Sequence, residues 1–346
     1  MTASFPLTGD EEKDEDVIMR ESDGDKRQFT ISDIPLWVHL AIGGVIAAVI
    51  IFAVVRLLIW NAGTAELDKS DTGSFEVEVL DQIFLLSEDK KEGHEFDEEE
   101  TILFLGNDSI TFDQGDTSVA AQVAGKLGAT CINCGYPAST VALKNASYSD
   151  DYPMDVYSFY NVANCIANED FSTLEANAGR FEDYTYTGST DRLKNVDFNK
   201  VDTIVIYYNA QDYMNLRIGM NPDNDVDPIT YRGALNAGIK AIQEKYPYIR
   251  IVCMSFTMCY SFDSSGQLVS GDRFDFGHGK LTTYLQFMID ISGERGVSFV
   301  DNYYGTIHED NSSEWMLDNI HVNAKCNEYV AEHFIKAIYP NGLNQN

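Results

Sequence analysis

The chain has 346 residues, of which 44% are hydrophobic, and a formal net charge of −31. This length and apolar content support at least one large buried core and exclude a chain that is disordered throughout. The excess of acids would repel phosphate backbones, which argues against a nucleic-acid partner, and we interpret it as a solubility feature.

An apolar segment near the N-terminus predicts a single transmembrane helix. Residues 34–60 are long enough to cross a bilayer, and their only strongly polar members are His39 and Arg56. Trp37 and Trp60 flank the run, as aromatic residues do at membrane interfaces. A cleaved signal peptide is the alternative, since small residues follow Trp60, but the long apolar core and the polar tail before it favour an uncleaved anchor.

The segments on either side of this predicted helix are acidic. The nearest bases are Arg20, Lys26 and Arg27 before the helix, and Arg56 and Lys69 at or beyond its far end. This bias places the tail, residues 1–33, in the cytoplasm and the rest of the chain outside it. Residues 61–99 are predicted to form an acidic linker that self-repulsion extends. Within it, residues 75–79 alternate with a period of two, which predicts a short strand against the body.

Residues 100–341 alternate apolar runs with amphipathic patterns, which predicts one α/β domain. The predicted strands are residues 101–105, 128–133, 203–208, 249–256 and 297–301, and the predicted helices are residues 118–127, 231–246, 280–294 and 325–339. Continuous apolar strands separated by helices indicate a central parallel sheet that is covered on both faces. We interpret the polar residues 168–200 as an insertion near the carboxyl edge of this sheet, where ligands bind in such folds.

The first predicted central strand ends in a polar turn that contains Asn107, Asp108 and Ser109. A helix cap or an Asx-turn is the simplest interpretation of these residue types. Near the C-terminus, however, Asp318 and His321 lie three residues apart. A serine becomes a good nucleophile when a base removes its proton, and the base works better when an acid fixes its tautomer. Together these residues suggest a serine-hydrolase site.

Four segments resemble, in order and approximate spacing, the four sequence blocks of the SGNH, or GDSL-like, hydrolases. They are LGNDSIT (residues 105–111), NCGYPAST (133–140), IVIYYNAQDY (204–213) and LDNIHVN (317–323). The resemblance covers about residues 100–341. It implies a three-layer, flavodoxin-like α/β fold and ester hydrolysis through an acyl-serine intermediate, without a metal or an organic cofactor.

The same resemblance assigns roles by position. Ser109 would be the nucleophile, His321 the general base and Asp318 the acid that orients it. The oxyanion hole would consist of the backbone N–H groups of Ser109 and Gly135 and the side-chain amide of Gln211. Candidate substrate-binding residues in these blocks are Asp108, Tyr136, Tyr208 and Asp212.

Two blocks depart from the family pattern. The family has glycine where this chain has Asn107 and Asn209, and asparagine is the residue that best tolerates positive φ after glycine. Gln211 stands where the family has asparagine, so the carboxamide donor is kept on a side chain that is longer by one methylene. A looser oxyanion hole would lower activity without abolishing it.

Other motifs have competing interpretations. The six cysteines are Cys131, Cys134, Cys165, Cys253, Cys259 and Cys326. Their even number allows disulfides in an oxidising compartment, and apolar surroundings fit buried thiols equally well. Cys131 and Cys134 match Cys-x-x-Cys, but a redox motif would open a helix after a first strand, and no second pair of zinc ligands has the expected spacing.

Loop residues supply further alternatives. His278 and His308 are competing bases, but only His321 has an acid at the family spacing. Asn107, Asn145 and Asn311 each begin an Asn-x-Ser sequon for glycosylation.

The sequence therefore predicts a single-pass membrane protein whose exported domain hydrolyses a small-molecule or polysaccharide ester, with an O-acetylated carbohydrate as the expected substrate class. A lipase or thioesterase of the same family is the nearest alternative. The changes at Asn209 and Gln211 motivate a second hypothesis, a catalytically weak binding or assembly module. A third is a scaffold whose acidic tail recruits partners in the cytoplasm.

Overall fold

The computed structural model describes residues 79–343 and, before them, positions 37, 40, 44, 46, 47 and 49–51. The chain divides into two units, Met1–Phe75 and Glu76–Asn346. The predicted tail, most of the predicted transmembrane helix, residues 61–78 of the predicted linker, and all but the last position of the strand predicted at residues 75–79 lie outside the described residues. Among the residues that are described, no helix has the length and apolar character needed to span a membrane.

A five-stranded parallel sheet forms the centre of the second unit. In spatial order its strands are β2 (Thr130–Asn133), β1 (Thr101–Gly106), β3 (Thr203–Tyr207), β4 (Arg250–Met254) and β7 (Ser298–Val300). Every residue of β3 and β4 is buried, as expected for strands that are covered on both faces. The five predicted strands and the parallel sheet are confirmed, and the strand order is that of flavodoxin-like folds.

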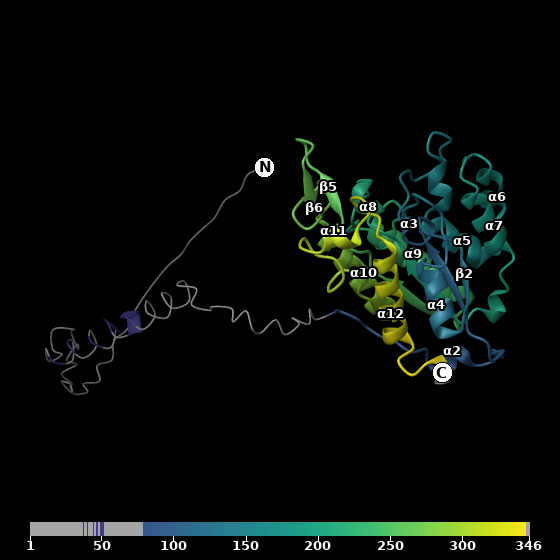
Figure 1. Ribbon diagram of the computed structural model, residues 1–346, viewed down its shortest axis with the longest axis horizontal. Helices are drawn as coiled ribbons and strands as arrows, with labels where there is room; N and C mark the ends of the chain where they lie inside the picture. Colours follow the sequence, from purple (N-terminus) through teal and green to yellow (C-terminus); the bar gives the residue numbers. More distant parts are fainter. Residues whose placement is uncertain are drawn as a thin grey trace, which may run out of the picture. The chain divides into compact units, whose positions relative to one another are not determined.

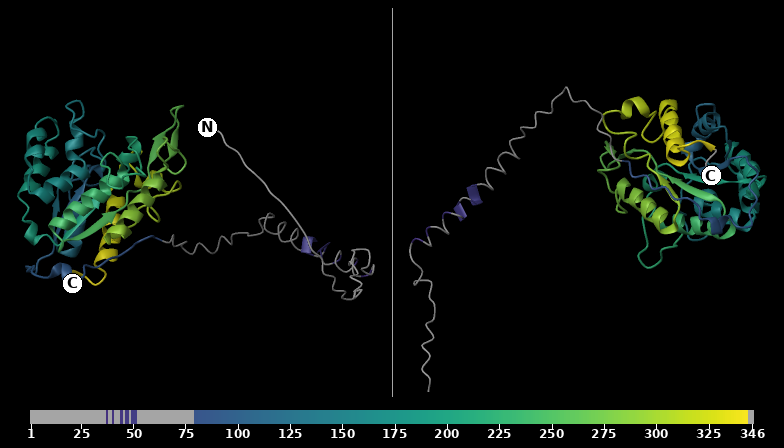
Figure 2. Two further views of the ribbon diagram at one scale, coloured as in Figure 1. Left: turned by 180° about the vertical axis from the view of Figure 1, so that it is seen from behind. Right: turned by 90° about the horizontal axis from the view of Figure 1, so that it is seen from below.

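Helices cover both faces of this sheet (Figure 1). The longer ones are α4 (Val119–Leu127), α5 (Phe159–Asn168), α6 (Ser172–Ala178), α7 (Thr185–Lys194), α9 (Tyr231–Lys245), α10 (Leu281–Arg295) and α12 (Ala324–Ile338). The short ones are α2 (Glu88–Lys91), α3 (Asp108–Thr111), α8 (Gln211–Met214), α11 (Ser312–Trp315) and the 3-10 helices η2 (Pro153–Tyr157) and η3 (Phe198–Lys200). Helix α4 packs against α12 in one layer, and α9 packs against α5 and α10 in the other (Figure 2). The four predicted helices correspond to α4, α9, α10 and α12, with ends that differ by at most one residue.

The end of the predicted linker lies along the free edge of β7. Gln82 and Phe299 exchange two backbone hydrogen bonds, at 2.9 and 2.8 Å, as an antiparallel bridge. The N–H group of Leu80 donates to a carboxylate oxygen of Asp301 at 3.0 Å. Residues 79–84 therefore belong to the folded unit and cover the edge of its sheet.

Two features were absent from the sequence-based prediction. The polar residues 168–200, interpreted above as an insertion near the carboxyl edge of the sheet, contain α6 and α7, and α7 packs beside β2. A separate antiparallel hairpin, β5 (Tyr260–Phe262) and β6 (Leu268–Ser270), follows β4. Its strands have three residues each, which is too short for a period-two pattern to stand out.

All six cysteines are free thiols. Burial raises the pKa of Cys131 and of Cys134 to about 12, which keeps both thiols of the Cys-x-x-Cys motif protonated and unsuited to redox chemistry. Asn107 is fully buried, so its sequon cannot accept a glycan in the folded protein.

Candidate active site

The polar turn after β1 lies at the carboxyl edge of the sheet, where the strand order reverses between β1 and β3. Gly106 at the end of β1 pairs with Tyr207 at the end of β3. A Cβ atom on Gly106 would lie 2.1 Å from the carbonyl oxygen of Tyr207, so the two strands can approach this closely only with glycine. Ligands of open α/β sheets bind at such reversal points, and the predicted nucleophile follows directly.

Ser109 lies in the single-turn helix α3, which begins immediately after β1. Asn107 caps this helix, because its Oδ1 accepts the backbone N–H of Ser109 at 3.3 Å. The hydroxyl of the partly buried Ser109 donates to the carbonyl of Tyr207. The turn therefore caps helix α3 and also positions Ser109 at the edge of the sheet. The Ser109 hydroxyl has to rotate away from the Tyr207 carbonyl before it can give its proton to a base.

The side chain of Asn107 joins three loops of the site. Its amide nitrogen donates to the carbonyl of Ser139 at 2.9 Å and to Oδ1 of Asn209 at 2.8 Å. Its Oδ1 accepts the backbone N–H groups of Ser109, at 3.3 Å, and of Asn209, at 2.8 Å. Every hydrogen-bonding position of this buried carboxamide is thus used.

The expectation that the two asparagines serve as substitutes for glycine at positive φ is wrong. Asn107 has φ −121°, and Asn209 is not among the residues with positive φ. Neither residue therefore replaces glycine by adopting a positive φ, and what distinguishes both from glycine is the side chain, which makes the bonds just described.

His321 and Asp318 lie on the loop between α11 and α12. Oδ2 of Asp318 is 2.6 Å from Nδ1 of His321, and Oδ1 accepts the backbone N–H groups of Ile320 and His321 at 2.9 and 2.7 Å. Partial burial disfavours the Asp318 carboxylate, but the bonds from His321 and Ile320 outweigh this effect and hold the pKa of Asp318 below its usual value. The carboxylate fixes the loop and the ring together, and leaves Nε2 of His321 for a reacting group.

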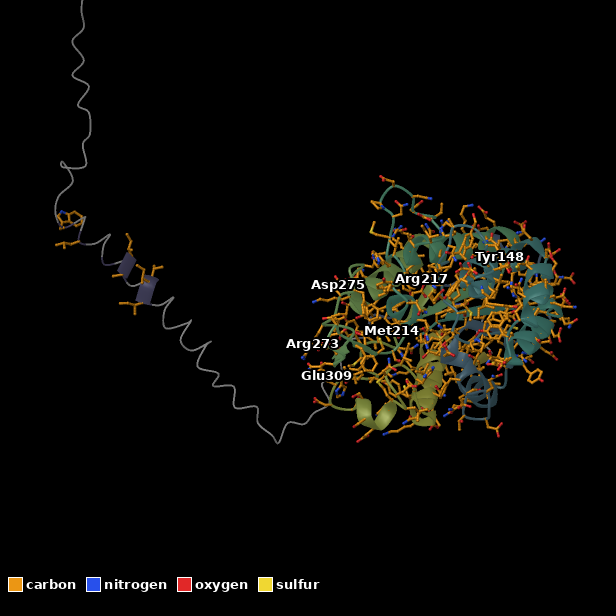
Figure 3. All side chains as sticks on the ribbon, turned by 90° about the horizontal axis from the view of Figure 1, so that it is seen from above. Tyr148, Met214, Arg217, Arg273, Asp275 and Glu309 are labelled. Atoms are coloured by element: carbon orange, nitrogen blue, oxygen red, sulfur yellow. The ribbon has the colours of Figure 1, made fainter. Side chains whose placement is uncertain are left out.

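The hairpin β5–β6 is hydrogen-bonded to the loop that carries Asp318 and His321. Between the predicted acid and base, the carbonyl of Asn319 accepts the N–H of Tyr260 at 2.8 Å, and the Asn319 side chain donates to the Tyr260 carbonyl at 3.0 Å. At the surface, Arg273 after β6 pairs with Glu309 before α11 at 3.1 Å (Figure 3), an exposed ion pair worth at most about 1 kcal/mol. The hairpin is thus part of the scaffold that holds the imidazole in place.

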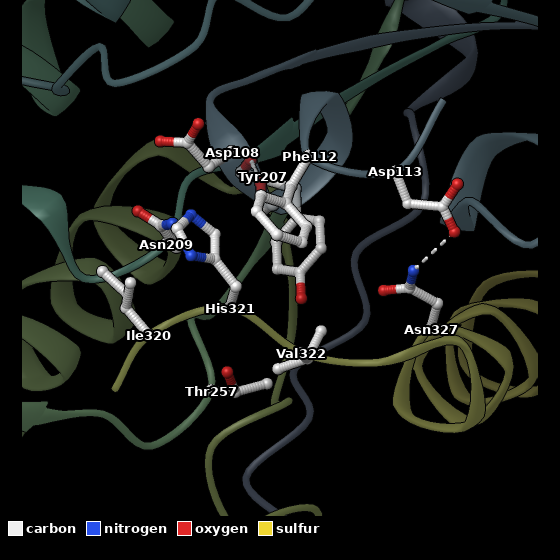
Figure 4. Close-up of a pocket in the computed structure, with 11 residues that line it drawn as sticks. Asp108, Phe112, Asp113, Tyr207, Asn209, Thr257, Ile320, His321, Val322 and Asn327 are labelled. Carbon is white, nitrogen blue, oxygen red and sulfur yellow. Dashed lines mark hydrogen bonds between the residues drawn. The ribbon is translucent and has the colours of Figure 1, made fainter. Parts of the chain in front are cut away.

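Ser109 and His321 line the same small pocket (Figure 4). Its volume is ≈ 20 Å³, about the space that one or two water molecules need by the same measure. The other lining residues are Asp108, Phe112, Asp113, Tyr207, Asn209, Thr257, Ile320, Val322 and Asn327. Residues that are more than two hundred positions apart in the sequence therefore meet in one pocket, as the motif spacing predicts.

Asp108 is a second carboxylate beside the imidazole. Burial raises its pKa above the usual value for aspartate, while the N–H of Ala138 at 2.9 Å, the charge of His321 and the side chain of Gln211 act in the opposite direction. Ala138 makes this contact from φ +53°, a conformation that is uncommon for residues other than glycine and often found at functional sites.

Two of the predicted oxyanion donors lie away from the pocket lining. The N–H of Gly135 donates to Oδ1 of Asn133 at 3.1 Å. The carboxamide of Gln211 accepts from Asn215 at 3.1 Å and also contacts Asp108. Neither Gly135 nor Gln211 lines the pocket that holds the serine.

Asn209 is the carboxamide that does line the pocket. Its side chain is nearly buried, with 8% exposed, and Oδ1 accepts from Asn107 at 2.8 Å and from the N–H of Gln211 at 3.2 Å. These two bonds fix the orientation of the carboxamide. They leave Nδ2 as a donor without a protein partner in the described part of the chain.

Three of the four candidate substrate-binding residues lie in the core. Tyr136 and Tyr208 are almost completely buried, and the Asp212 carboxylate accepts two backbone N–H groups of the loop that follows β2. Their positions in the motif blocks are close to the site in sequence, but their side chains point into the protein. Of the four, Asp108 alone lines the pocket.

Phe112 and Thr257 line the pocket without having been predicted. Phe112 follows Ser109 by three residues, so a helical turn after β1 places both on one face. Thr257 follows β4 at the carboxyl edge, a position that the predicted parallel sheet would have identified. Predicting Phe112 would have required knowing where α3 begins, and predicting Thr257 would have required knowing where β4 ends.

Comparisons with known proteins identify the fold. No protein-family model matches the sequence, and no curated protein sequence is significantly similar to it. Solved structures that resemble this chain include proteins described as a possible lipase, an acetyl xylan esterase and a carbohydrate acetylesterase.

One solved structure aligns with 71% of this chain and 98% of its own, with a TM-score of 0.51 and 17% sequence identity. A possible lipase from Chitinophaga pinensis aligns with 71% of this chain and 100% of its own, with a TM-score of 0.47 and 14% identity. A carbohydrate acetylesterase from Sinorhizobium meliloti aligns with 68% of this chain and 96% of its own, with a TM-score of 0.40 and 11% identity. The first alignment shows that this chain shares its α/β fold with a known structure, and a shared fold does not by itself assign an activity.

Proposed function

We propose that this chain is a serine esterase that acts through an acyl-serine intermediate. The observation that carries the proposal is the pocket lined by both Ser109 and His321, with Asp318 held 2.6 Å from the imidazole. A nucleophile, a base and an acid that orients the base are the minimum that acyl transfer through serine requires. The four segments that resemble SGNH hydrolases support the same assignment.

In the proposed reaction, Nε2 of His321 accepts the Ser109 proton while Oγ attacks the ester carbonyl. The oxyanion of the tetrahedral intermediate receives a hydrogen bond from Nδ2 of Asn209. His321 then gives the proton to the leaving alcohol as the carbon–oxygen bond breaks, and the acyl group stays on Ser109. A water molecule that His321 deprotonates releases the carboxylic acid and restores the serine. Asp318 remains ionised throughout, since its pKa is held low.

The size and lining of the pocket favour a short acyl group on a polar alcohol. A volume of ≈ 20 Å³ leaves little enclosed space, which suits a group as small as the methyl of an acetyl ester better than a long acyl chain. Asp108, Asp113 and Asn327 offer hydrogen-bonding groups for hydroxyls. An O-acetylated carbohydrate is therefore our proposed substrate class, ahead of a lipid ester or a thioester.

Acetate release by the purified full-length protein and by its Ser109→Ala variant tests this proposal. We expect the wild type to deacetylate acetylated oligosaccharides and p-nitrophenyl acetate, with a rate at least about tenfold lower on the octanoate ester. Ser109→Ala should lose about 10³-fold or more. Equal rates for the two proteins would contradict the esterase proposal.

A catalytically weak binding module is the second candidate. Two observations favour it: the Ser109 hydroxyl donates to Tyr207, and the N–H of Gly135 is occupied by Asn133. Both groups would have to be released before they could act in catalysis. Calorimetric binding of acetylated oligosaccharides without turnover would support this candidate instead.

We also propose that residues 34–60 anchor the protein in a membrane as one helix, with the hydrolase domain outside the cytoplasm. The support comes from the length of the apolar run, its flanking Trp37 and Trp60, and the distribution of bases. The protein should stay in the membrane fraction after alkaline carbonate extraction, and protease added to intact cells should digest the domain. Extraction by carbonate would contradict the anchor, and protection from protease would contradict the orientation.

A further inference from the structure

We propose that Phe112 positions the imidazole of His321 for proton transfer with Ser109, an inference that rests on the proposed esterase function. The ring centroids of Phe112 and His321 are 4.0 Å apart, and the ring planes are 16° from parallel. The phenyl ring therefore covers one face of the imidazole, next to the nucleophile (Figure 4).

The stack supplies a constraint that Asp318 alone does not. A single hydrogen bond to Nδ1 tolerates a range of angles, so on its own it would let the imidazole tilt about its Cβ–Cγ bond. Contact with the flat face of Phe112 fixes the plane of the ring. Together the two contacts determine where Nε2 points, and proton transfer depends steeply on that direction.

Phe112 is also rigidly connected to the nucleophile. It ends the helix that carries Ser109, with helical φ and ψ of −64° and −41°, and its N–H donates to the carbonyl of Asp108 at 3.1 Å. Residues three apart on a helical turn share a face, so Ser109 and Phe112 project to the same side. The contact between Phe112 and His321 thus sets the position of the imidazole relative to Ser109, because Phe112 and Ser109 are held together by the single turn of α3.

The chemistry of the proposed reaction suits this contact. When His321 accepts the serine proton it becomes a cation, and the face of an aromatic ring attracts cations. Phe112 is 52% exposed, so burial contributes little to keeping it in place. Single exposed apolar side chains are common, and the near-parallel contact with the imidazole is what distinguishes Phe112 from them.

The test compares Phe112→Leu with Phe112→Tyr in the full-length protein. Leucine keeps an apolar side chain but has no ring face, whereas tyrosine keeps the face. We expect Phe112→Leu to lower kcat about tenfold with KM changed less than about twofold, and Phe112→Tyr to stay within about twofold of wild-type kcat. Phe96→Leu is the matched control, because Phe96 is also exposed and contacts a histidine, His94, with centroids 4.6 Å apart. It lies near the amino ends of β1 and β3 and should leave kcat unchanged.

A spectroscopic measurement separates this inference from the esterase proposal. Histidine labelled with ¹³C at Cε1 gives one NMR signal for His321, which is assigned by its loss in His321→Ala. The ring current of Phe112 should shift this signal upfield in Ser109→Ala, and Phe112→Leu in the same background should remove the shift. Wild-type kcat in Phe112→Leu, a raised KM with unchanged kcat, or an unchanged His321 signal would overturn the positioning role. If wild type and Ser109→Ala are equally inactive, it is the esterase proposal that fails.

Discussion

Asn107 and Asn209 are joined by two hydrogen bonds that run in opposite directions. The side-chain amide of Asn107 donates to Oδ1 of Asn209, and the backbone N–H of Asn209 donates to Oδ1 of Asn107, both at 2.8 Å. One residue follows β1 and precedes Ser109, and the other follows β3 and lines the pocket. This reciprocal pair therefore sets the spacing between the serine and its candidate oxyanion donor.

Asn107→Gly should destabilise the protein, even though glycine is the residue that the resembling family has here. The change removes every bond of the carboxamide and leaves the buried carbonyl of Ser139 and the N–H of Asn209 without partners. Each such group costs about 1–3 kcal/mol, so we expect the free energy of unfolding to fall by about 2–4 kcal/mol. Urea denaturation measures the loss, and a change below about 0.5 kcal/mol would contradict a structural role.

Asn209→Asp and Gln211→Ala distinguish the two candidate carboxamides. Aspartate keeps the oxygen that accepts from Asn107 but offers no N–H to an oxyanion, so kcat should fall about 10²–10³-fold. Gln211→Ala should change kcat less than about fivefold, since that carboxamide is engaged with Asn215 and Asp108. Steady-state kinetics with p-nitrophenyl acetate decide between them. The opposite ranking would return the role to Gln211, as the family resemblance implies.

Asp318→Asn should lower kcat about 10³-fold without unfolding the protein. Asparagine can still accept backbone N–H groups, but it cannot stabilise the imidazolium that forms in the reaction. The pKa of Asp318 is held below its usual value, so its carboxylate is ionised wherever an ordinary aspartate is, and an acid limb in the pH–rate profile near neutral pH must come from another group. Rates from about pH 5 to about pH 9 test this, and a variant that keeps a tenth of wild-type kcat would contradict it.

Asp212 should make stability decrease as the pH rises. Complete burial raises its pKa to about 6, although its carboxylate accepts the N–H groups of Val141 and Ala142 at 2.7 and 2.9 Å. The folded protein therefore retains a proton that the unfolded chain has already lost. The stability linked to this proton is present below the ordinary aspartate pKa of about 4 and is lost as the pH rises through about 6.

This linkage amounts to about 3 kcal/mol in all, of which about 1 kcal/mol falls between about pH 5 and about pH 7.5. Asp212→Asn cannot titrate and serves as the reference, because it shares every other charge with the wild type. Urea denaturation of both proteins at the two pH values should show the wild type losing more stability than the variant. Parallel pH dependences would show that Asp212 is ionised throughout.

The sheet could be predicted from the sequence because its strands are continuous apolar runs. Thr203–Tyr207, for example, is buried along its whole length. The long helices could be predicted because their apolar residues recur with the period of an amphipathic helix. The hairpin β5–β6 could not be predicted, since three-residue strands carry no periodic signal and their partner, Asn319, is distant in sequence.

The candidate site also contains residues that could be predicted from the sequence and residues that could not. That Ser109, Asp318 and His321 lie together could be predicted, because their residue types and order match those that acyl transfer would require. The bond between Asn107 and Asn209 spans 102 residues and leaves no local pattern, so the sequence suggested a backbone role for residues that act through their side chains. Tyr208 and Asp212 were misplaced because nearness to the site along the chain does not determine the direction of a side chain.

The contact of residues 79–84 with β7 also bears on how the domain can be produced in isolation. Without Gln82 the outermost strand would present unpaired N–H and C=O groups, which readily recruit a strand from another molecule. A recombinant version that starts at the first sheet strand would expose this edge and tend to aggregate through intermolecular strand pairing. Shortened forms of the protein should therefore keep residue 79 and everything after it.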